Sequence, residues 1–233
     1  MNNLLLRTHE ISQLSIYQTH QLGETWDMHL PNKNNQWTWG MSLALYSKPY
    51  RETNGEQVNT TQGHMINRFK YHEELSDVER NEIAKNFSDQ VFNLIKKELR
   101  KEFPDPKNPP FDICLGLPEN RNTGRSLPRD ICRNLSQEHE WLKDGFASVT
   151  KTRTGVVMKA IPHDERPEKV KGLYKIDRNF LPQPRRGFLI VDDVFETGST
   201  VGGLCDTLEH EFPQLPRYVI ALTHLHATER MLK

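Results

Sequence analysis

The hydrophobic pattern divides the chain into two zones, and the first covers residues 1–65. Within it, large apolar side chains occupy every second position from Trp37 to Leu45, with small or polar residues between them. This period of two predicts a half-buried strand. Asn54-Gly55 then supplies a hairpin turn signal. The zone is rich in Asn and Gln, and we predict that it forms a small β-containing extension.

Residues 76–99 carry the pattern of a long amphipathic helix. Ser76, with Glu79 three residues later, is a capping box, which marks the start of a helix. Apolar residues then recur at helical spacing, at Val78, Ile83, Phe87, Val91, Leu94, Ile95 and Leu99. The helix is expected to end before Pro104, and the prolines that follow predict a stiff connector.

Strand and helix patterns alternate in the rest of the chain. Short apolar runs predict strands over residues 111–117, 146–149, 188–194 and 218–223. Helices are predicted around Leu127, Ile131 and Leu135 and over residues 200–211. This alternation is typical of βαβ units, and it predicts a largely parallel sheet with helices on both faces. We therefore expect an α/β domain over residues 66–233, after the extension of residues 1–65.

The composition excludes several classes of protein. The 233 residues include 31 Lys and Arg and 31 Asp and Glu, so the formal net charge is zero. A disordered tail normally carries a large net charge, and a general DNA binder carries a basic excess. The longest apolar runs have about five residues, against the roughly 20 of a membrane span. We expect a soluble globular protein with no secretory signal, no membrane contact and no general DNA binding.

The three cysteines, Cys114, Cys132 and Cys205, are widely spaced and form no CxxC pair. This spacing indicates neither a disulfide framework nor a zinc ribbon. Cys114 and Cys132 lie in apolar stretches, so they are predicted to be small core residues. Free thiols of this kind fit a reducing cytoplasm, which is the expected compartment.

Residues 188–200 (FLIVDDVFETGST) are the most informative stretch for function. A buried strand is followed by two carboxylates, Asp192 and Asp193, and then by a Thr-Gly-Ser-Thr turn that opens a helix. In open α/β sheets, ligands bind outside the carboxyl ends of the strands. Successive backbone N–H groups and three hydroxyls at a helix N-terminus suit a phosphate group.

The two carboxylates would repel a phosphate unless they held sugar hydroxyls or a divalent cation. A sugar phosphate bound with Mg²⁺ satisfies both halves of the motif. An acidic strand end that only caps the next helix is the plain structural alternative. The chain has neither GxxxxGK[ST] nor GxGxxG, so P-loop and dinucleotide-binding sites have little support.

This run resembles the phosphoribosyl-pyrophosphate (PRPP) signature of the type I phosphoribosyltransferases. Residues 66–225 are also similar to the competence-protein F (ComF) branch of that family. Three segments are similar. Ile66 to Tyr71 (INRFKY) resembles a segment before the family's first long helix, and residues 118–133 resemble its pyrophosphate loop and the following helix. The stretch from Arg153 through Arg166 to Tyr174 resembles the region ahead of the signature, although Lys169 stands near the position of the family's Asn. The branch's N-terminal cysteine-rich zinc element is missing, and the Asn/Gln-rich segment stands in its place.

The resemblance implies a type I phosphoribosyltransferase fold and a definite reaction. The reaction is transfer of a 5-phosphoribosyl group from PRPP to a nitrogen nucleophile, expected to be a nucleobase, with Mg²⁺ and release of pyrophosphate. Asp192 and Asp193 would hold the ribose hydroxyls, directly or through water bound to Mg²⁺. The 5-phosphate would bind at Thr197, Gly198, Ser199 and Thr200, with a backbone amide from Glu196.

Basic residues between the predicted strands are candidates for the pyrophosphate. Residues 111–186 hold 15 Lys and Arg against 10 Asp and Glu, although the whole chain is neutral. Arg121 and Arg125 follow the first strand and are the expected pyrophosphate ligands. In this fold a segment such as residues 150–160 often forms a mobile hood, from which Lys151 and Arg153 would reach the substrates. For all four, a solvated surface position is the alternative.

Three further features leave alternatives open. Glu196 stands where purine-type members of the family carry an acid, so it is a candidate general base or nucleobase-orienting group, or else a solvent-exposed carboxylate. His224 and His226 could ligate a metal, but ordinary packing is the expected role. Trp37 and Trp39 could stack bases from one strand face, but core or subunit contact is expected instead.

Three function classes remain open on the sequence alone. The first is the PRPP-dependent enzyme. The second is a non-catalytic PRPP- or nucleotide-sensing module of a DNA-uptake or mobile-element defence system, and Arg121, Arg125 and Arg153 favour the enzyme over it. The third is a DNA-processing factor, since the ComF branch is associated with DNA uptake. A homodimer and a protein partner of the N-terminal extension are candidate assemblies.

Overall fold

A five-strand parallel sheet forms the centre of the protein. The computed structural model describes residues 28–30, 36–51, 57–72, 74–99, 109–119, 126–153, 161–162 and 165–225. The parallel strands are, in spatial order, β2 (Trp39–Leu45), β10 (Arg217–His224), β9 (Phe188–Phe195), β5 (Ile113–Gly116) and β6 (Lys143–Asp144). The short strand β1 (Met28–His29) pairs with β2 in the antiparallel direction at one edge.

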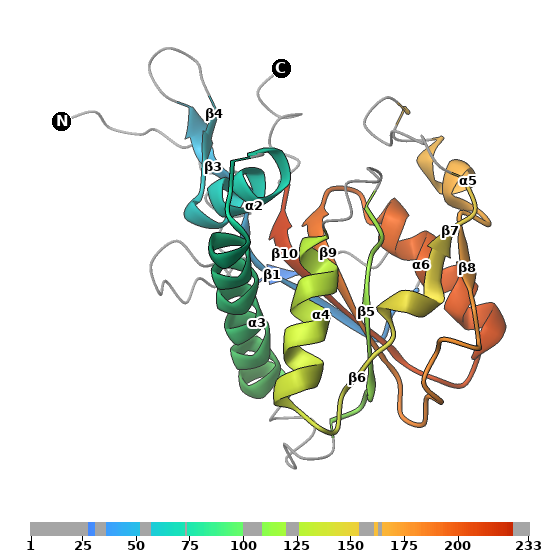
Figure 1. Cartoon of the computed structure of the whole chain (residues 1–233). Helices are drawn as coiled ribbons and strands as arrows, with labels where there is room; N and C mark the ends of the chain where they lie inside the picture. The colour runs from blue at the N-terminus through green and yellow to red at the C-terminus, as the bar shows by residue number, and fades with distance from the viewer. Residues whose placement is uncertain are drawn as a thin grey trace.

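Helices cover both faces of this sheet (Figure 1). One face carries α2 (Thr61–Tyr71), α3 (Asp77–Leu99) and α4 (Leu127–Glu138). The other carries α5 (Arg166–Val170), α6 (Ser199–Glu211) and a two-stranded sheet of β7 (Val149–Lys151) and β8 (Tyr174–Ile176). This is the predicted α/β architecture, and it is compatible with a type I phosphoribosyltransferase fold.

Alternation along the strands builds a separate apolar core on each face. Val191 and Ile220 point to the side of α2, α3 and α4, whereas their neighbours Ile190 and Val219 pack toward α6 and β8. Cys114 and Cys132 are buried and free, as predicted for small core residues, and Cys205 is buried and free as well. Within the described parts of the chain, no helix is both long enough and apolar enough to span a membrane.

Local sequence signals start and end the helices where they were predicted. Ser76 Oγ accepts a hydrogen bond from the Glu79 amide at 3.3 Å, and the Ser76 amide donates to Glu79 Oε2 at 3.0 Å. These two bonds complete the predicted capping box, and α3 ends at Leu99, before Pro104. The predicted strands that became β5, β9 and β10, and the helices that became α4 and α6, are also confirmed.

One predicted strand is wrong, and one helix was not predicted. Residues 146–149 were expected to be a strand, but Phe146–Ser148 form a 3₁₀ turn that leads into β7, outside the main sheet. Asp144 Oδ1 accepts from the Phe146 amide at 2.9 Å and turns the chain there, so the short apolar run cannot extend. The helix α2 was not predicted, because its apolar residues are few and Gly63 weakens the pattern.

The strand predicted for the N-terminal zone exists, but it is not half-buried and it is not part of a separate extension. β2 pairs with β10 in the central sheet, and Met41 and Leu43 join the core beneath α2 and α3. On a half-buried strand, Ser42 and Ala44 would face water, yet both are fully buried. Small side chains on the second face of a strand are compatible with close packing against other elements as well as with exposure to water.

The predicted boundary after residue 65 therefore cuts through one folded unit. After β2, the strands β3 (Ser47–Arg51) and β4 (Gln57–Asn59) form an antiparallel pair, while Asn54 and Gly55 lie outside the described residues. Thr60 then caps α2, since its Oγ1 accepts from the Gly63 amide at 3.0 Å and donates to the Leu45 carbonyl. A Cβ at Gly63 would lie only 1.9 Å from the carbonyl oxygen of Tyr46, so α2 begins directly against the end of β2.

Leu43→Ala tests whether β2 is a core strand. Leu43 is 3% exposed, so its truncation is expected to lower the free energy of unfolding by about 2–5 kcal/mol, measured by urea denaturation. Val78→Ala, at a residue 67% exposed on α3, is the control and is expected to change it by less than about 0.5 kcal/mol. A cost for Leu43→Ala no larger than that of the control would contradict the placement of β2.

Candidate functional site

The sheet has its topological switch point at the carboxyl ends of β5 and β9, and we use the word crevice for the region around these strand ends. After β5 the chain continues through α4 to β6 on one side, and after β9 it continues through α6 to β10 on the other. A parallel sheet binds its ligands at such a switch point. Figure 1 shows that α2 and α5 lie at this same end of the sheet.

Asp192 and Asp193 line this crevice. The register pairs Gly116, the last residue of β5, with Val191, and the Leu117 amide donates to the Val191 carbonyl at 2.9 Å. The two aspartates are therefore the first residues of β9 beyond the end of β5. Both are buried, although their carboxylates carry the charge that water normally solvates.

The two carboxylates serve opposite faces of the sheet, because adjacent strand residues alternate. Asp193 forms an ion pair with Lys70 of α2, on the face that the three N-terminal helices cover. Asp192 lies near the phenol of Tyr174 on β8, on the face of α6, and its charge adds to the burial that raises the Tyr174 pKa. The sequence motif thus supplies two carboxylates with different neighbours.

Burial and charge shift the titration of the groups around the crevice. Burial raises the pKa of Asp192 to about 8, and the Asp193 charge adds to this, while Lys70 and Lys151 oppose it. Burial lowers the pKa of Lys151, against the pull of the two aspartates and Glu119. Burial also acts to lower the pKa of Lys70, but the ion pair with Asp193 and the charges of Glu119 and Asp192 together outweigh it, so this pKa is raised.

Glu119 is a site residue that the sequence did not single out. It follows β5 by three residues, and burial, followed by the charge of Asp193, raises its pKa to about 7. Its Oε1 is buried and accepts no hydrogen bond from the described residues. The signal that could have found it is its position after a predicted strand that pairs with β9.

The hydroxyl oxygen of Tyr174, like Glu119 Oε1, is a buried polar atom of the crevice that lacks a hydrogen-bond partner within the described parts of the chain. Tyr174 is only 3% exposed, so water does not simply solvate the hydroxyl. Buried polar groups without partners are costly, and in a cleft they are typical of positions that a ligand completes. Tyr174 and Glu119 therefore indicate a polar ligand in this crevice.

The Thr-Gly-Ser-Thr turn has the predicted form. Gly198 adopts left-handed dihedrals (φ 76°) at the N-cap of α6 and offers no side-chain cap, while Thr197 Oγ1 accepts a hydrogen bond from the Ser199 amide at 3.4 Å. A Cβ at Gly198 would lie 2.7 Å from the ring of Phe195, so both the backbone and the packing require glycine. Thr197 Oγ1 and Ser199 Oγ lie 2.9 Å apart at the mouth of the turn. Together with Thr200 they surround the open helix N-terminus, which suits an anion.

Glu196 is held by a buried arginine from α5. Arg166 is 4% exposed, and its guanidinium donates to Glu196 Oε2 at 2.8 Å and to the Ile161 carbonyl at 3.0 Å. This ion pair joins the segment before β8 to the turn after β9. Glu196 is therefore a partnered carboxylate, and its role as a general base stays a prediction.

The predicted basic residues divide into three groups. Lys151 lies in the crevice, where its charge acts on Asp192 and Glu119. Arg153 instead is exposed and donates to the carbonyls of Lys169 and Lys171 at 3.2 and 2.9 Å, so it braces the end of α5. Arg121, Arg125 and the hood residues 154–160 lie outside the described residues.

The remaining aromatic candidates are packing residues. Trp37 is buried and meets Phe195 edge to face, with ring centroids 6.0 Å apart, in the core beneath the turn. Trp39 packs against the core of the opposite face, so the two tryptophans share no surface on which a base could stack. His224 is buried against the same Phe195 ring, and His226 lies outside the described residues.

The donors of the crevice fit a magnesium ion only if a ligand completes its coordination. In the part of the chain that the structure describes, no three His, Cys, Asp or Glu side chains are grouped to hold a metal. Mg²⁺ commonly takes one or two carboxylates together with phosphate oxygens and water, and the carboxylate of Asp192 suits that arrangement. Asp193 is engaged by Lys70.

Comparison with known proteins adds no functional assignment. No family model matches the chain, and no curated protein matches it either. The functional inference below therefore rests on the residues of the crevice.

Glu119→Gln tests the burial of the third carboxylate through the pH dependence of stability. The raised pKa means that the folded protein holds the Glu119 proton more tightly than the unfolded chain does. The stability from this proton is fully present below the ordinary pKa of about 4.5 and is lost as the pH rises through about 7. Between about pH 5 and about pH 8, the variant is expected to lose roughly 2 kcal/mol less unfolding free energy than the wild type.

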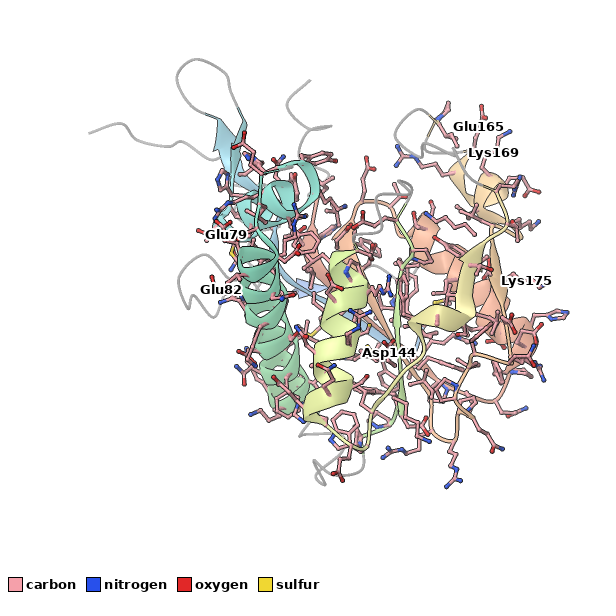
Figure 2. The ribbon with its side chains drawn as sticks, viewed as in Figure 1. Glu79, Glu82, Asp144, Glu165, Lys169 and Lys175 are labelled. Atoms are coloured by element: carbon pink, nitrogen blue, oxygen red, sulfur yellow. The ribbon has the colours of Figure 1, made fainter. Side chains whose placement is uncertain are left out.

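The control for this experiment is Glu82→Gln, at an exposed carboxylate on α3 (Figure 2). Its unfolding free energy, measured in urea at both pH values, is expected to run parallel to that of the wild type. A Glu119→Gln variant that also runs parallel would show that the folded state does not bury this carboxylate.

Proposed function

We propose that the protein is a Mg²⁺-dependent phosphoribosyltransferase that uses PRPP. The observation that carries this proposal lies at the end of β9, where a buried carboxylate pair within the strand is followed by a short turn and the N-terminus of α6. The left-handed Gly198 is the N-cap residue of that helix. A ligand with hydroxyls at one end and a phosphate at the other fits both parts, and a ribose 5-phosphate has this form.

Each group of the crevice has a role in this proposal. Thr197, Ser199 and Thr200 would bind the 5-phosphate together with the backbone amides of the turn. Asp192 would accept hydrogen bonds from the ribose hydroxyls, and the unpaired Tyr174 hydroxyl beside it would gain a partner. Lys151, with the predicted ligands Arg121 and Arg125, would face the pyrophosphate.

The proposed reaction replaces one bond at the anomeric carbon of the ribose. The lone pair of an acceptor nitrogen forms the new N–C bond, the C–O bond to pyrophosphate breaks, and the pyrophosphate keeps the electron pair. The acceptor nitrogen releases its proton to a base or to water. A magnesium ion bound with the pyrophosphate would neutralise the negative charge that develops there.

A non-catalytic sensor of PRPP or of a nucleotide is the second candidate. The ion pair between Arg166 and Glu196 favours it, because this pair occupies the carboxylate that would otherwise act on an acceptor. Such a module would bind PRPP in the same crevice without transferring the ribosyl group. The two candidates predict the same binding and differ in pyrophosphate release.

Incubation with PRPP, Mg²⁺ and a panel of nucleobases tests the proposal, with pyrophosphate release as the readout. We expect PRPP binding by calorimetry and release with at least one base. Gly198→Ala is expected to weaken PRPP binding about tenfold, because a left-handed alanine costs roughly 1–2 kcal/mol and the new Cβ collides with Phe195.

Gly172→Ala is the matched control for this variant. Gly172 also has a left-handed backbone, with φ 62°, but a Cβ there meets nothing within 4 Å. It carries the same backbone penalty away from the turn, so it is expected to keep wild-type affinity for PRPP. Binding without release on any base would favour the sensor, and absence of PRPP binding would reject both candidates.

Glu196→Gln separates the acid–base hypothesis from a positioning role. If Glu196 accepts a proton from the acceptor base, the amide is expected to lower turnover about 100-fold or more with PRPP affinity unchanged. Asp193→Asn is the comparison and is expected to abolish turnover. Unchanged turnover in Glu196→Gln beside an inactive Asp193→Asn would remove the acid–base role and leave Glu196 as the partner of Arg166.

A further inference from the structure

Lys70 places a fixed positive charge inside the crevice. It lies in the last turn of α2, its side chain is only 22% exposed, and its ammonium group forms an ion pair with Asp193 Oδ2. Glu119 and Asp192 are close enough for their charges to act on it as well. Among the described residues, Asp193 is thus the carboxylate in contact with the ammonium group, and two further carboxylates act on it through their charge.

The protein holds this lysine in place with a second buried cation. Arg80 of α3 is 5% exposed, and its guanidinium donates to the Phe69, His72 and Leu75 carbonyls at 3.2, 3.0 and 3.0 Å. One of these carbonyls, that of Phe69, belongs to the last turn of α2, where carbonyl groups lack partners within the helix, and the other two follow the helix. The end of the helix that carries Lys70 is therefore fixed against α3, and Lys70 does not depend on a flexible loop for its position.

An ammonium group at Asp193 stands where a divalent cation would have to bind that carboxylate. The carboxylate is buried, so it needs a nearby positive charge. Lys70 supplies that charge without any ligand. A free metal ion that approached Asp193 would be repelled by the charge of this fixed, largely buried lysine.

We propose that Lys70 acts as a resident cation at Asp193, which takes the place of a divalent metal ion and keeps the free protein from binding one. This inference rests on the proposed function, in which a metal ion enters together with the pyrophosphate of PRPP and meets Asp192. Asp193, the second carboxylate, then stays neutralised by Lys70 while the sugar phosphate binds.

Removal of the Lys70 charge is expected to create a metal site in the free protein. In Lys70→Met, the buried Asp193 carboxylate loses its counter-ion, while Asp192 and Glu119 remain within electrostatic range of it. Mn²⁺, used as a probe for Mg²⁺ and measured by paramagnetic resonance without PRPP, is expected to bind this variant at least about tenfold more tightly than the wild type.

Three variants control for charge and fold. Lys70→Arg keeps the positive charge and is expected to bind Mn²⁺ as weakly as the wild type. Lys175→Met removes a charge from the outer side of β8 (Figure 2) and is also expected to leave Mn²⁺ binding unchanged. The double variant Lys70→Met/Asp193→Asn removes the carboxylate as well and is expected to return to weak binding.

Lys70→Met can also lower stability, because it leaves a buried charge unpaired. For a destabilised variant, the unfolding temperature is measured with and without about 10 mM Mn²⁺. An ion that binds only the folded state raises this temperature. We expect this rise in Lys70→Met and not in the wild type. Absence of both tighter binding and a rise in unfolding temperature would overturn the proposal.

The result of the Mn²⁺ experiment can be distinguished from the result of the test of the proposed function. Mn²⁺ binding is measured on the free protein, whereas the proposed function is tested by PRPP binding to the wild type. A wild type that fails to bind PRPP rejects the enzyme and the sensor, and the Mn²⁺ series still decides whether Lys70 excludes a metal ion. Tight Mn²⁺ binding by the wild type would overturn the Lys70 proposal alone.

Discussion

The burial of two adjacent carboxylates at the end of β9 is the constraint on which the crevice depends. Asp192 and Asp193 extend past the end of β5 and lie inside the protein, where an unpaired charge is costly. The fold therefore has to bring cations to them from other elements. Lys70 of α2 meets Asp193, and Lys151 of β7 lies within electrostatic range of both. These contacts connect the N-terminal part of the chain, the central sheet and the β7–β8 sheet at one point.

This requirement explains why the N-terminal zone is part of the domain. β2 pairs with β10, and Thr60 starts α2 directly against the end of β2. Arg80 then binds the carbonyls at the other end of α2. The helix is thus fixed at both ends, and its last turn places Lys70 in the crevice. The chain uses a strand and a helix outside the signature motif to neutralise a charge inside it.

The crevice also keeps polar groups that the described protein residues do not satisfy. The Tyr174 hydroxyl and Glu119 Oε1 are buried without hydrogen-bond partners among these residues, and burial raises the pKa of Asp192. Each of these costs folding free energy, which is typical of a site prepared for a ligand rather than of a core. The turn at Gly198 offers backbone amides nearby, so the two halves of the crevice suit different parts of one polar molecule.

Elements with local signals could be predicted from the amino-acid sequence. The capping box at Ser76, the apolar run of β9 and the Gly-containing turn after it each depend on neighbouring residues, and each appears where it was predicted. What those patterns face depends on how distant segments pack. Ser42 and Ala44 are buried by elements distant in sequence. The ion-pair partners are distant in sequence too, since Lys70 binds Asp193 and Arg166 binds Glu196. Periodicity shows which residues share a face of a strand or helix. Burial and ion pairing depend on which distant segments cover that face, and a local pattern carries no information about those segments.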